Sequence, residues 1–109
     1  MSWLVSEGRV LASLEVAGNG RSRLRGLLGR DTFEGALLIR PARSVHTLGM
    51  RFPLDVAFCS SDLDVLATRQ VRPHRLPLPP RGTRVVIEAE AGAFERWGLV
   101  AGQQLEVRS

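Results

Sequence analysis

The sequence predicts a mainly β protein, a compact antiparallel β-sandwich or barrel-like domain with one or two short helices. Apolar and polar residues alternate over several short segments, and this two-residue period is typical of half-buried strands. Glycine, proline, serine and aspartate separate these segments, as in the turns of an all-β fold. No segment is long enough for the crossover helices of a doubly wound parallel sheet. The 109 residues are the length of one domain, which we expect to span residues 1–109.

The first half of the chain predicts a hairpin, a short helix and a buried strand. Trp3–Val5 and Val10–Val16 flank a short turn, which is the pattern of a hairpin. A glycine-rich turn then leads into Arg21–Leu28, where leucines on one side and arginines on the other indicate a short amphipathic helix. Ala36–Arg40 is mostly apolar, and Pro41 ends this strand because proline cannot donate to a ladder.

The second half adds three strands, a stiff loop and a helical turn. Leu63–Val71 alternates after a hairpin turn, and the prolines of residues 72–82 favour an extended connection. Arg84–Glu90 is the last long strand, and Gln104–Val107 is a closing one. Gly92–Trp97, which Gly98 ends, predicts one or two turns of helix.

The stretch from His46 to Asp55 gathers the polar residues that are hardest to place in an apolar centre. Its two-residue period predicts one strand that continues as far as Cys59. The face expected to join the core comprises Met50, Phe52, Leu54, Val56 and Phe58. The opposite face comprises Arg51, Pro53, Asp55, Ala57 and Cys59, so it carries a base and an acid among smaller side chains.

Four polar residues form the candidate ligand-binding site: His46, Arg51, Asp55 and Glu88. Arg51 and Asp55 share a strand face but lie roughly 13 Å apart at the usual rise per residue, so each needs a partner from elsewhere. Glu88, on the polar side of its own strand, is such a partner for Arg51. We expect a non-catalytic binding or accessory module whose pocket holds a small polar or anionic ligand, or a protein segment. The alternative is a purely structural or interaction protein, in which the cluster fixes strand register.

Catalysis is a further alternative, in which a hydrolase uses Asp55 and Glu88 as its acid and base. Nothing in the sequence fixes the distance between these two carboxylates. Close ligand spacings such as His-x-His or Cys-x-x-Cys are missing, and the glycine-rich nucleotide motifs are incomplete, so we expect neither a metal nor a cofactor. Cys59 lies beside a turn with no base tied to it, as is typical of an inert thiol.

Positive charge is concentrated in the middle of the chain. All fifteen basic residues are arginine, and residues 21–84 hold twelve of them against five acids. Such an excess attracts anionic partners. Nucleic acid is nevertheless not expected, because the arginine-rich stretch 69–84 has no aromatic residue on which bases could stack.

The expected compartment is the cytoplasm. Cys59 is the only cysteine, so no intramolecular disulfide can form. Neither a signal peptide nor a membrane-spanning run of about 20 apolar residues is visible. The identity of any partner and the oligomeric state stay open.

Five blocks, in order and at compatible spacing, resemble the family called domain of unknown function 192. They are Arg25–Arg30 (R-G-L-M/L), Gly35–Ile39 (G-M-L-F), Pro53–Asp55 (P-L-D), Ile87–Gly92 (L-E-x-P-A-G) and Gly98–Gly102 (G-x-x-x-G). The resemblance runs from about Arg23 to Val107. It implies a small, mainly β, sandwich-like domain with no established activity. It also implies that Asp55 and Glu88 matter to the domain, because they stand where the family's motifs place their acids.

The central block departs from the family's commonest pattern. Many members have W-M-K-N-T before P-L-D, whereas this chain has His46–Met50, as in a subgroup with H-T-x-G-M-R. A site built on that tryptophan, lysine or asparagine therefore does not carry over. Many relatives also have a secretory leader, which this sequence does not show, so the resemblance does not imply a periplasmic location.

Overall fold

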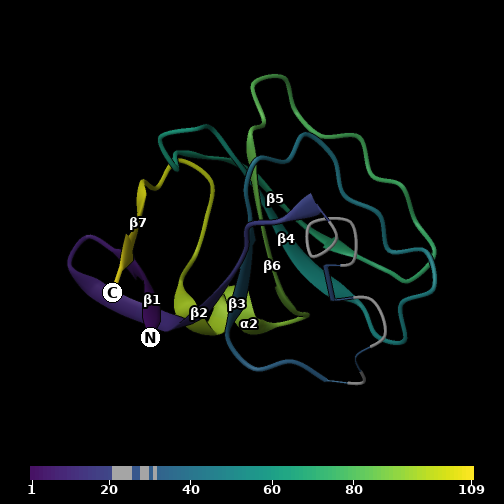
Figure 1. The fold of residues 1–109 in the computed structure, drawn as a ribbon, viewed down its shortest axis with the longest axis horizontal. Coiled ribbons are helices and arrows are strands. Elements are labelled where there is room, and N and C mark those ends of the chain that lie inside the picture. The colour runs from purple at the N-terminus through teal and green to yellow at the C-terminus, as the bar shows by residue number, and fades with distance from the viewer. Residues whose placement is uncertain (21–25, 28–29, 31) are drawn as a thin grey trace.

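Seven strands form one curled sheet in the computed structural model, which describes residues 1–20, 26–27, 30 and 32–109 (Figure 1). They are β1 (Ser2–Ser6), β2 (Arg9–Ala17), β3 (Ala36–Ile39), β4 (Leu54–Cys59), β5 (Val65–Val71), β6 (Val85–Glu90) and β7 (Leu105–Arg108). The short helix α2 (Ala93–Trp97) follows β6. Across the sheet the order is β5-β4-β6-β3-β2-β1-β7. The mainly β class is confirmed, and no helix among the described residues has the length and apolar character to cross a bilayer.

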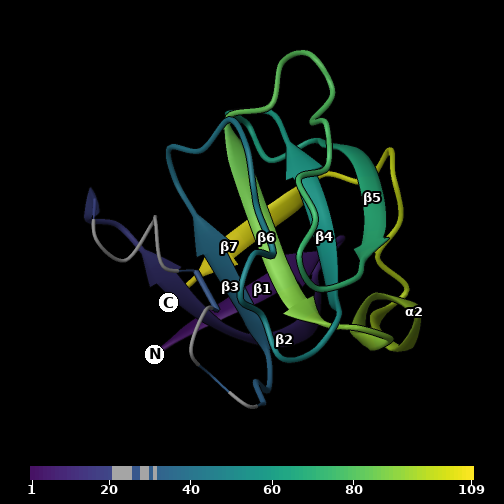
Figure 2. The ribbon, with the colours of Figure 1, turned by 90° about the vertical axis from the view of Figure 1, so that its right-hand side faces the viewer.

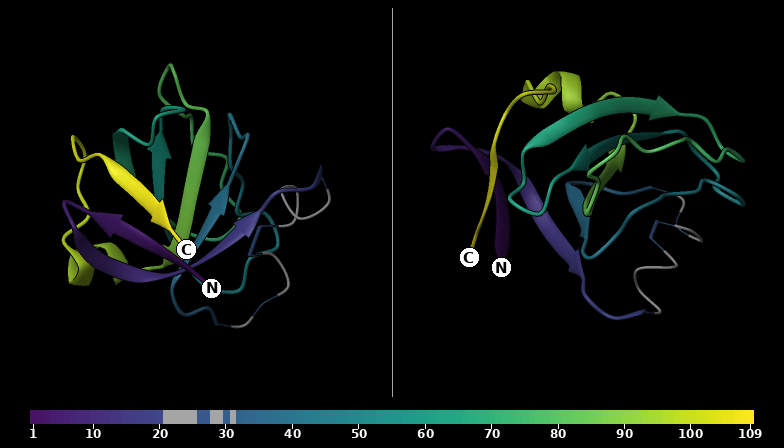
Figure 3. Two further views of the ribbon diagram at one scale, coloured as in Figure 1. Left: turned by 60° about the vertical axis from the view of Figure 1, so that its left-hand side comes forward. Right: turned by 90° about the horizontal axis from the view of Figure 1, so that it is seen from above.

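The sheet curls until its two edges meet at one end, which makes it a half-open barrel (Figure 3). Asp64, just before β5, forms an antiparallel bridge with Gln104, just before β7. The Val65 N–H also donates to the Gln103 carbonyl at 2.8 Å. Because β1 and β7 pair along their length, both ends of the chain lie side by side.

One strand pair corrects the expected antiparallel sheet. β2 and β3 run parallel, whereas every other neighbouring pair of described strands is antiparallel. A parallel pair needs a connection of a dozen or more residues to bring the chain back to the same end, and residues 18–35 supply it. The helix predicted at Arg21–Leu28 falls in this connection, and it lies outside the described residues except for Gly26 and Leu27.

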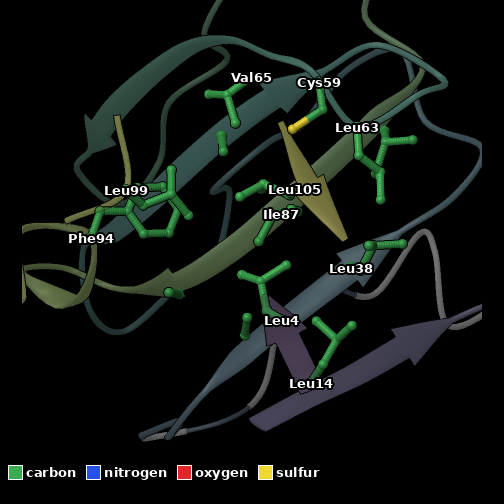
Figure 4. Close-up of a cluster of buried hydrophobic side chains, with 14 of the residues drawn as sticks. Leu4, Leu14, Leu38, Cys59, Leu63, Val65, Ile87, Phe94, Leu99 and Leu105 are labelled. Carbon is green, nitrogen blue, oxygen red and sulfur yellow. The ribbon is translucent and has the colours of Figure 1, made fainter. Parts of the chain in front are cut away.

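The inside of the curl is an apolar core to which all seven strands and α2 contribute (Figure 4). Most of these side chains are aliphatic, and the aromatic ring of Phe94 enters from α2. The side chains labelled in the close-up are Leu4, Leu14, Leu38, Cys59, Leu63, Val65, Ile87, Phe94, Leu99 and Leu105. This core, called the inner core below, fixes which face of each strand points inward.

A second apolar cluster, called the outer core, lies on the opposite face of the sheet. Its residues are Ala17, Leu27, Phe33, Leu37, Ile39, Val45, Met50, Leu54, Val56, Phe58, Val71 and Val86. The predicted division of the central strand into two faces is confirmed, since Met50, Leu54, Val56 and Phe58 lie in the outer core and Ala57 and Cys59 in the inner core. The second face is covered as well, because all six residues of β4, including Asp55, are buried. The strand itself begins at Leu54, however, rather than near Met50. Gly49, whose φ is 79°, and Pro53 interrupt the extended backbone, so the residues before Leu54 form a loop. Met50 packs on the outer core from this loop.

Candidate functional site

The structure divides the four predicted site residues between the two faces of the sheet and a loop. Glu88 projects from β6 onto the outer face, where Val56 of β4 is its neighbour. Asp55 projects from β4 onto the inner face, toward α2. His46 lies in the loop before β4 and lines the same cavity as Glu88. Arg51 is exposed in that loop and is not among the residues that line the cavity.

Asp55 holds the beginning of α2. Its Oδ2 accepts hydrogen bonds from the backbone N–H groups of Gly92 at 2.9 Å and Phe94 at 3.0 Å. The first N–H groups of a helix have no partner within the helix, and a carboxylate there satisfies them and offsets the helix dipole. Figure 2 shows why a strand supplies this acceptor: β6 ends and α2 begins beside the start of β4. Asp55 therefore stabilises the start of α2.

Glu88 is a buried acid on the opposite face. Only 2% of its surface is exposed. Burial raises the pKa of Glu88 from 4.5 to about 7, and a hydrogen bond from the Leu27 backbone acts in the opposite direction. Its Oε1 atom is buried without a hydrogen-bond partner in the described part of the chain. Leaving a buried oxygen unpaired costs roughly 1–3 kcal/mol, so this position calls for an explanation.

Gly26 brings the backbone unusually close to this carboxylate. A Cβ atom at Gly26 would lie 2.9 Å from Oε1 of Glu88, closer than side chains normally approach. Its φ of 51° also falls in the left-handed region that glycine adopts readily. Gly26 therefore leaves space beside Oε1 that any larger residue would take.

A cavity of about 310 Å³ opens beside Glu88 on the outer face of the sheet. Its walls are mainly aliphatic side chains and prolines, with a few polar groups among them. The residues that line it are Gly26, Leu27, Ile39, Ser44, Val45, His46, Met50, Leu76, Pro77, Leu78, Pro79 and Glu88. Nδ1 of His46 is a second buried polar atom without a hydrogen-bond partner among residues 1–20, 26–27, 30 and 32–109. An apolar cavity with a few convergent polar groups is the usual form of a small-molecule site.

The proline-rich loop forms one side of the cavity mouth. Leu76 and Leu78 belong to this loop, and they are 69% and 81% exposed. Two large aliphatic side chains exposed next to a cavity are a ready contact surface for the apolar part of a ligand. The sequence indicated the stiffness of this loop but not its position over Glu88.

Thr47, which sequence reasoning passed over, fixes the loop in place. Its hydroxyl donates to the Arg72 carbonyl at 2.6 Å and accepts from the Arg75 N–H at 2.8 Å. Its carbonyl also accepts the His74 N–H, and its own N–H donates to the Arg75 carbonyl at 2.9 Å. Thr47 is fully buried. Its place within the His46–Met50 block was the only signal in the sequence.

The geometry limits the chemistry of this site. Asp55 and Glu88 lie on opposite faces of the sheet, so it does not support a hydrolase that uses them as a pair. Among the described residues, no arginine lines the cavity. Within its apolar walls the pocket has a carboxylate oxygen and an imidazole nitrogen to which no described residue forms a hydrogen bond. Such a surface suits an apolar molecule with a hydrogen-bond donor.

Comparison with known proteins identifies the family. The model of the DUF192 family, described as "Uncharacterized ACR", matches residues 3–107. The chain belongs to this family. The resemblance seen in the five sequence blocks is thereby confirmed. A UPF0127 protein of Pyrococcus furiosus is 28% identical over 108 residues, which cover 94% of this chain and 93% of that protein.

Two crystal structures share the fold of this DUF192 protein. A protein of unknown function from Novosphingobium aromaticivorans has a TM-score of 0.80 and 22% sequence identity, over 96% of this chain and 82% of that one. A protein from Sinorhizobium meliloti, named as a proposed transcription regulator, has a TM-score of 0.81 and 24% identity, over 97% of this chain and 91% of that one. The description of the DUF192 family gives no activity, and the Novosphingobium protein is one of unknown function.

Proposed function

We propose that this DUF192 protein is a non-catalytic binding module for a small molecule that combines an apolar body with a hydrogen-bond donor. The cavity beside Glu88 is the binding site. The observation that carries this proposal is the buried Oε1 of Glu88 in the wall of that cavity, which has no hydrogen-bond partner among the described residues. A donor on the ligand supplies the missing partner, and so removes the cost of the unpaired oxygen.

The described walls of the cavity favour an amine or alcohol over an anion. Burial raises the pKa of Glu88 to about 7, so its charged and protonated forms are both populated near neutral pH. An ammonium group pairs with the charged form, and a hydroxyl group donates to it as well. At about 310 Å³ the cavity is at the small end of ligand pockets, which run from about 300 to 1,000 Å³.

Binding of benzylamine and ethylbenzene to the intact protein tests this function. The two probes have nearly the same size and shape, but only benzylamine carries a donor. We expect NMR titration at pH 7.5 to shift the amide signals of Leu27, Val45 and Met50, with benzylamine the tighter ligand. Glu88→Ala removes the acceptor, so the preference for benzylamine should disappear while ethylbenzene still binds.

Glu90→Ala is the matched control, because Glu90 is an exposed acid on the same strand and does not line the cavity. This variant should keep the preference for benzylamine. If neither probe moves the signals around the cavity, or if Glu88→Ala keeps the preference, the pocket is not a site of this kind.

The proposed compartment is the cytoplasm. Cys59 is the only cysteine of the sequence, and it is buried in the inner core as a free thiol. Proteins without disulfides are typical of reducing compartments. Fractionation of cells that express the full natural protein checks this assignment, and recovery outside the cytoplasm would contradict it.

A further inference from the structure

A second hollow, of about 390 Å³, lies at the outer edge of the sheet where β5 ends. Arg69, Arg72 and Arg75 line it, together with Gln70, Val71 and Pro77. The register places Arg69 on the outer face, in the same row as Glu88, with Val56 of β4 between them. Pro77 lines both hollows, so the proline-rich loop separates an acidic pocket from an arginine-lined one.

The three arginines are held close together by the fold. Arg69 is part of β5, and its backbone is paired with β4. Arg72 and Arg75 lie beyond the end of that strand, where the hydroxyl of Thr47 bonds the backbone of both. The backbone of these three arginines is therefore fixed before any ligand arrives, which reduces the ordering cost of binding.

No described carboxylate balances the positive charge in this hollow. None of its described lining residues is acidic, and none of the three guanidinium groups forms an ion pair with another described residue. Within the described part of the chain, the Arg75 guanidinium donates to just two carbonyls, those of Pro73 and His74, at 3.4 Å. Gathered like charges repel, and a bound anion offsets that repulsion.

We propose that this hollow is an anion site that binds a small phosphate-bearing molecule. Guanidinium groups present paired N–H donors that match the oxygens of phosphate. Three arginines around one hollow suit a compact group with two or more negative charges. A nucleic acid strand fits less well, because none of the described residues that line the hollow is an aromatic one on which bases could stack.

Titration of the full chain with inorganic pyrophosphate tests the proposal. We expect calorimetry at low salt to show sub-millimolar binding, and NMR signals from Gln70 to Arg75 to shift. The double variant Arg69→Gln/Arg72→Gln should weaken binding at least tenfold. Arg81→Gln/Arg96→Gln removes the same charge from exposed positions outside the hollow and should change binding less than twofold. Urea denaturation of each variant checks that all four substitutions leave the fold intact.

Three outcomes would overturn the proposal. The first is no binding of pyrophosphate to the wild-type protein. The second is an equal loss in both double variants, which would mean that general positive charge attracts the anion. The third is tight, Arg69-dependent binding of a single-stranded DNA 12-mer while pyrophosphate does not bind, which would make nucleic acid the partner instead.

Discussion

Asp55 and Glu88 lie on neighbouring strands, one position out of register, and their side chains leave the sheet on opposite faces. Asp55 is paired with Ala89, and Val56 with Glu88. Because side chains alternate along a strand, this offset of one residue separates two acids that would otherwise face the same way. Asp55 therefore holds a helix, whereas Glu88 lines a cavity, and substitution of the two acids should have different consequences.

Asp55→Ala should lower the free energy of unfolding by roughly 2–4 kcal/mol. The N–H groups of Gly92 and Phe94 both lose their acceptor, and the Phe94 bond is buried. Urea denaturation measures the change. Asp55→Asn keeps one acceptor oxygen and should lose less. An unchanged unfolding midpoint in Asp55→Ala would show that Asp55 does not stabilise the start of α2.

Glu88 should make the protein less stable as pH rises. The folded state holds a proton on Glu88 up to about pH 7, whereas the unfolded chain loses it near pH 4.5. Between these values the unfolded state binds fewer protons, so this contribution to stability falls with pH and reaches a cost of about 3 kcal/mol above pH 7. Below pH 4.5 it vanishes, because both states are protonated.

Glu88→Gln removes this dependence. The stability of the variant relative to wild type should rise by up to about 3 kcal/mol between pH 4.5 and pH 8. Urea denaturation at a series of pH values measures this difference. The exposed acid Glu90 provides the control, since Glu90→Gln should show no such rise. Parallel pH curves for wild type and Glu88→Gln would contradict the burial argument.

Thr47→Val should loosen the proline-rich loop. The substitution keeps the shape of the side chain but removes the hydroxyl that bonds Arg72 and Arg75, at a cost of roughly 1–3 kcal/mol. Hydrogen exchange of the Arg75 amide should become faster. Thr68→Val, the same change at a half-buried position of β5, is the control and should leave that exchange rate unaltered. Equal exchange in Thr47→Val and wild type would mean that other contacts hold the loop.

Cys59 should be unreactive while the protein is folded. Its side chain is fully buried, and burial, followed by the negative charge of Asp64, raises the pKa of this thiol to about 12. The thiolate that attacks disulfide reagents is therefore scarce at pH 8. Labelling with Ellman's reagent should proceed only as fast as the fold opens, and should be complete at once in concentrated guanidinium. Rapid labelling of the native protein would contradict the buried position.

Two contacts in the tertiary structure join sequence blocks that lie far apart along the chain. Gly26, from the R-G-L block, lies against the carboxylate of Glu88, and Asp55, from the P-L-D block, accepts from Gly92. Glu88 and Gly92 both belong to the block at Ile87–Gly92. That block therefore takes part in two separate interactions on opposite faces of the sheet, one with a glycine turn and one with an acid.

The sequence by itself determined the strands, because a two-residue period and the turns between segments are local properties of the chain. It placed β1, β2, β3, β5, β6 and β7 to within two residues at each end. It also indicated α2 and the family.

Only the tertiary structure decided which faces are buried and which polar residues meet. The central strand is covered on both faces, since the loop before it folds back onto the outer core, and periodicity alone describes one covered face. Contacts between distant parts of the chain set the parallel pairing of β2 with β3. They also set the register of β4 against β6, in which Asp55 and Glu88 are offset by one residue. The register of β4 and β6 places Asp55 at a helix and Glu88 at a cavity, because register sets the side of the sheet to which every side chain points.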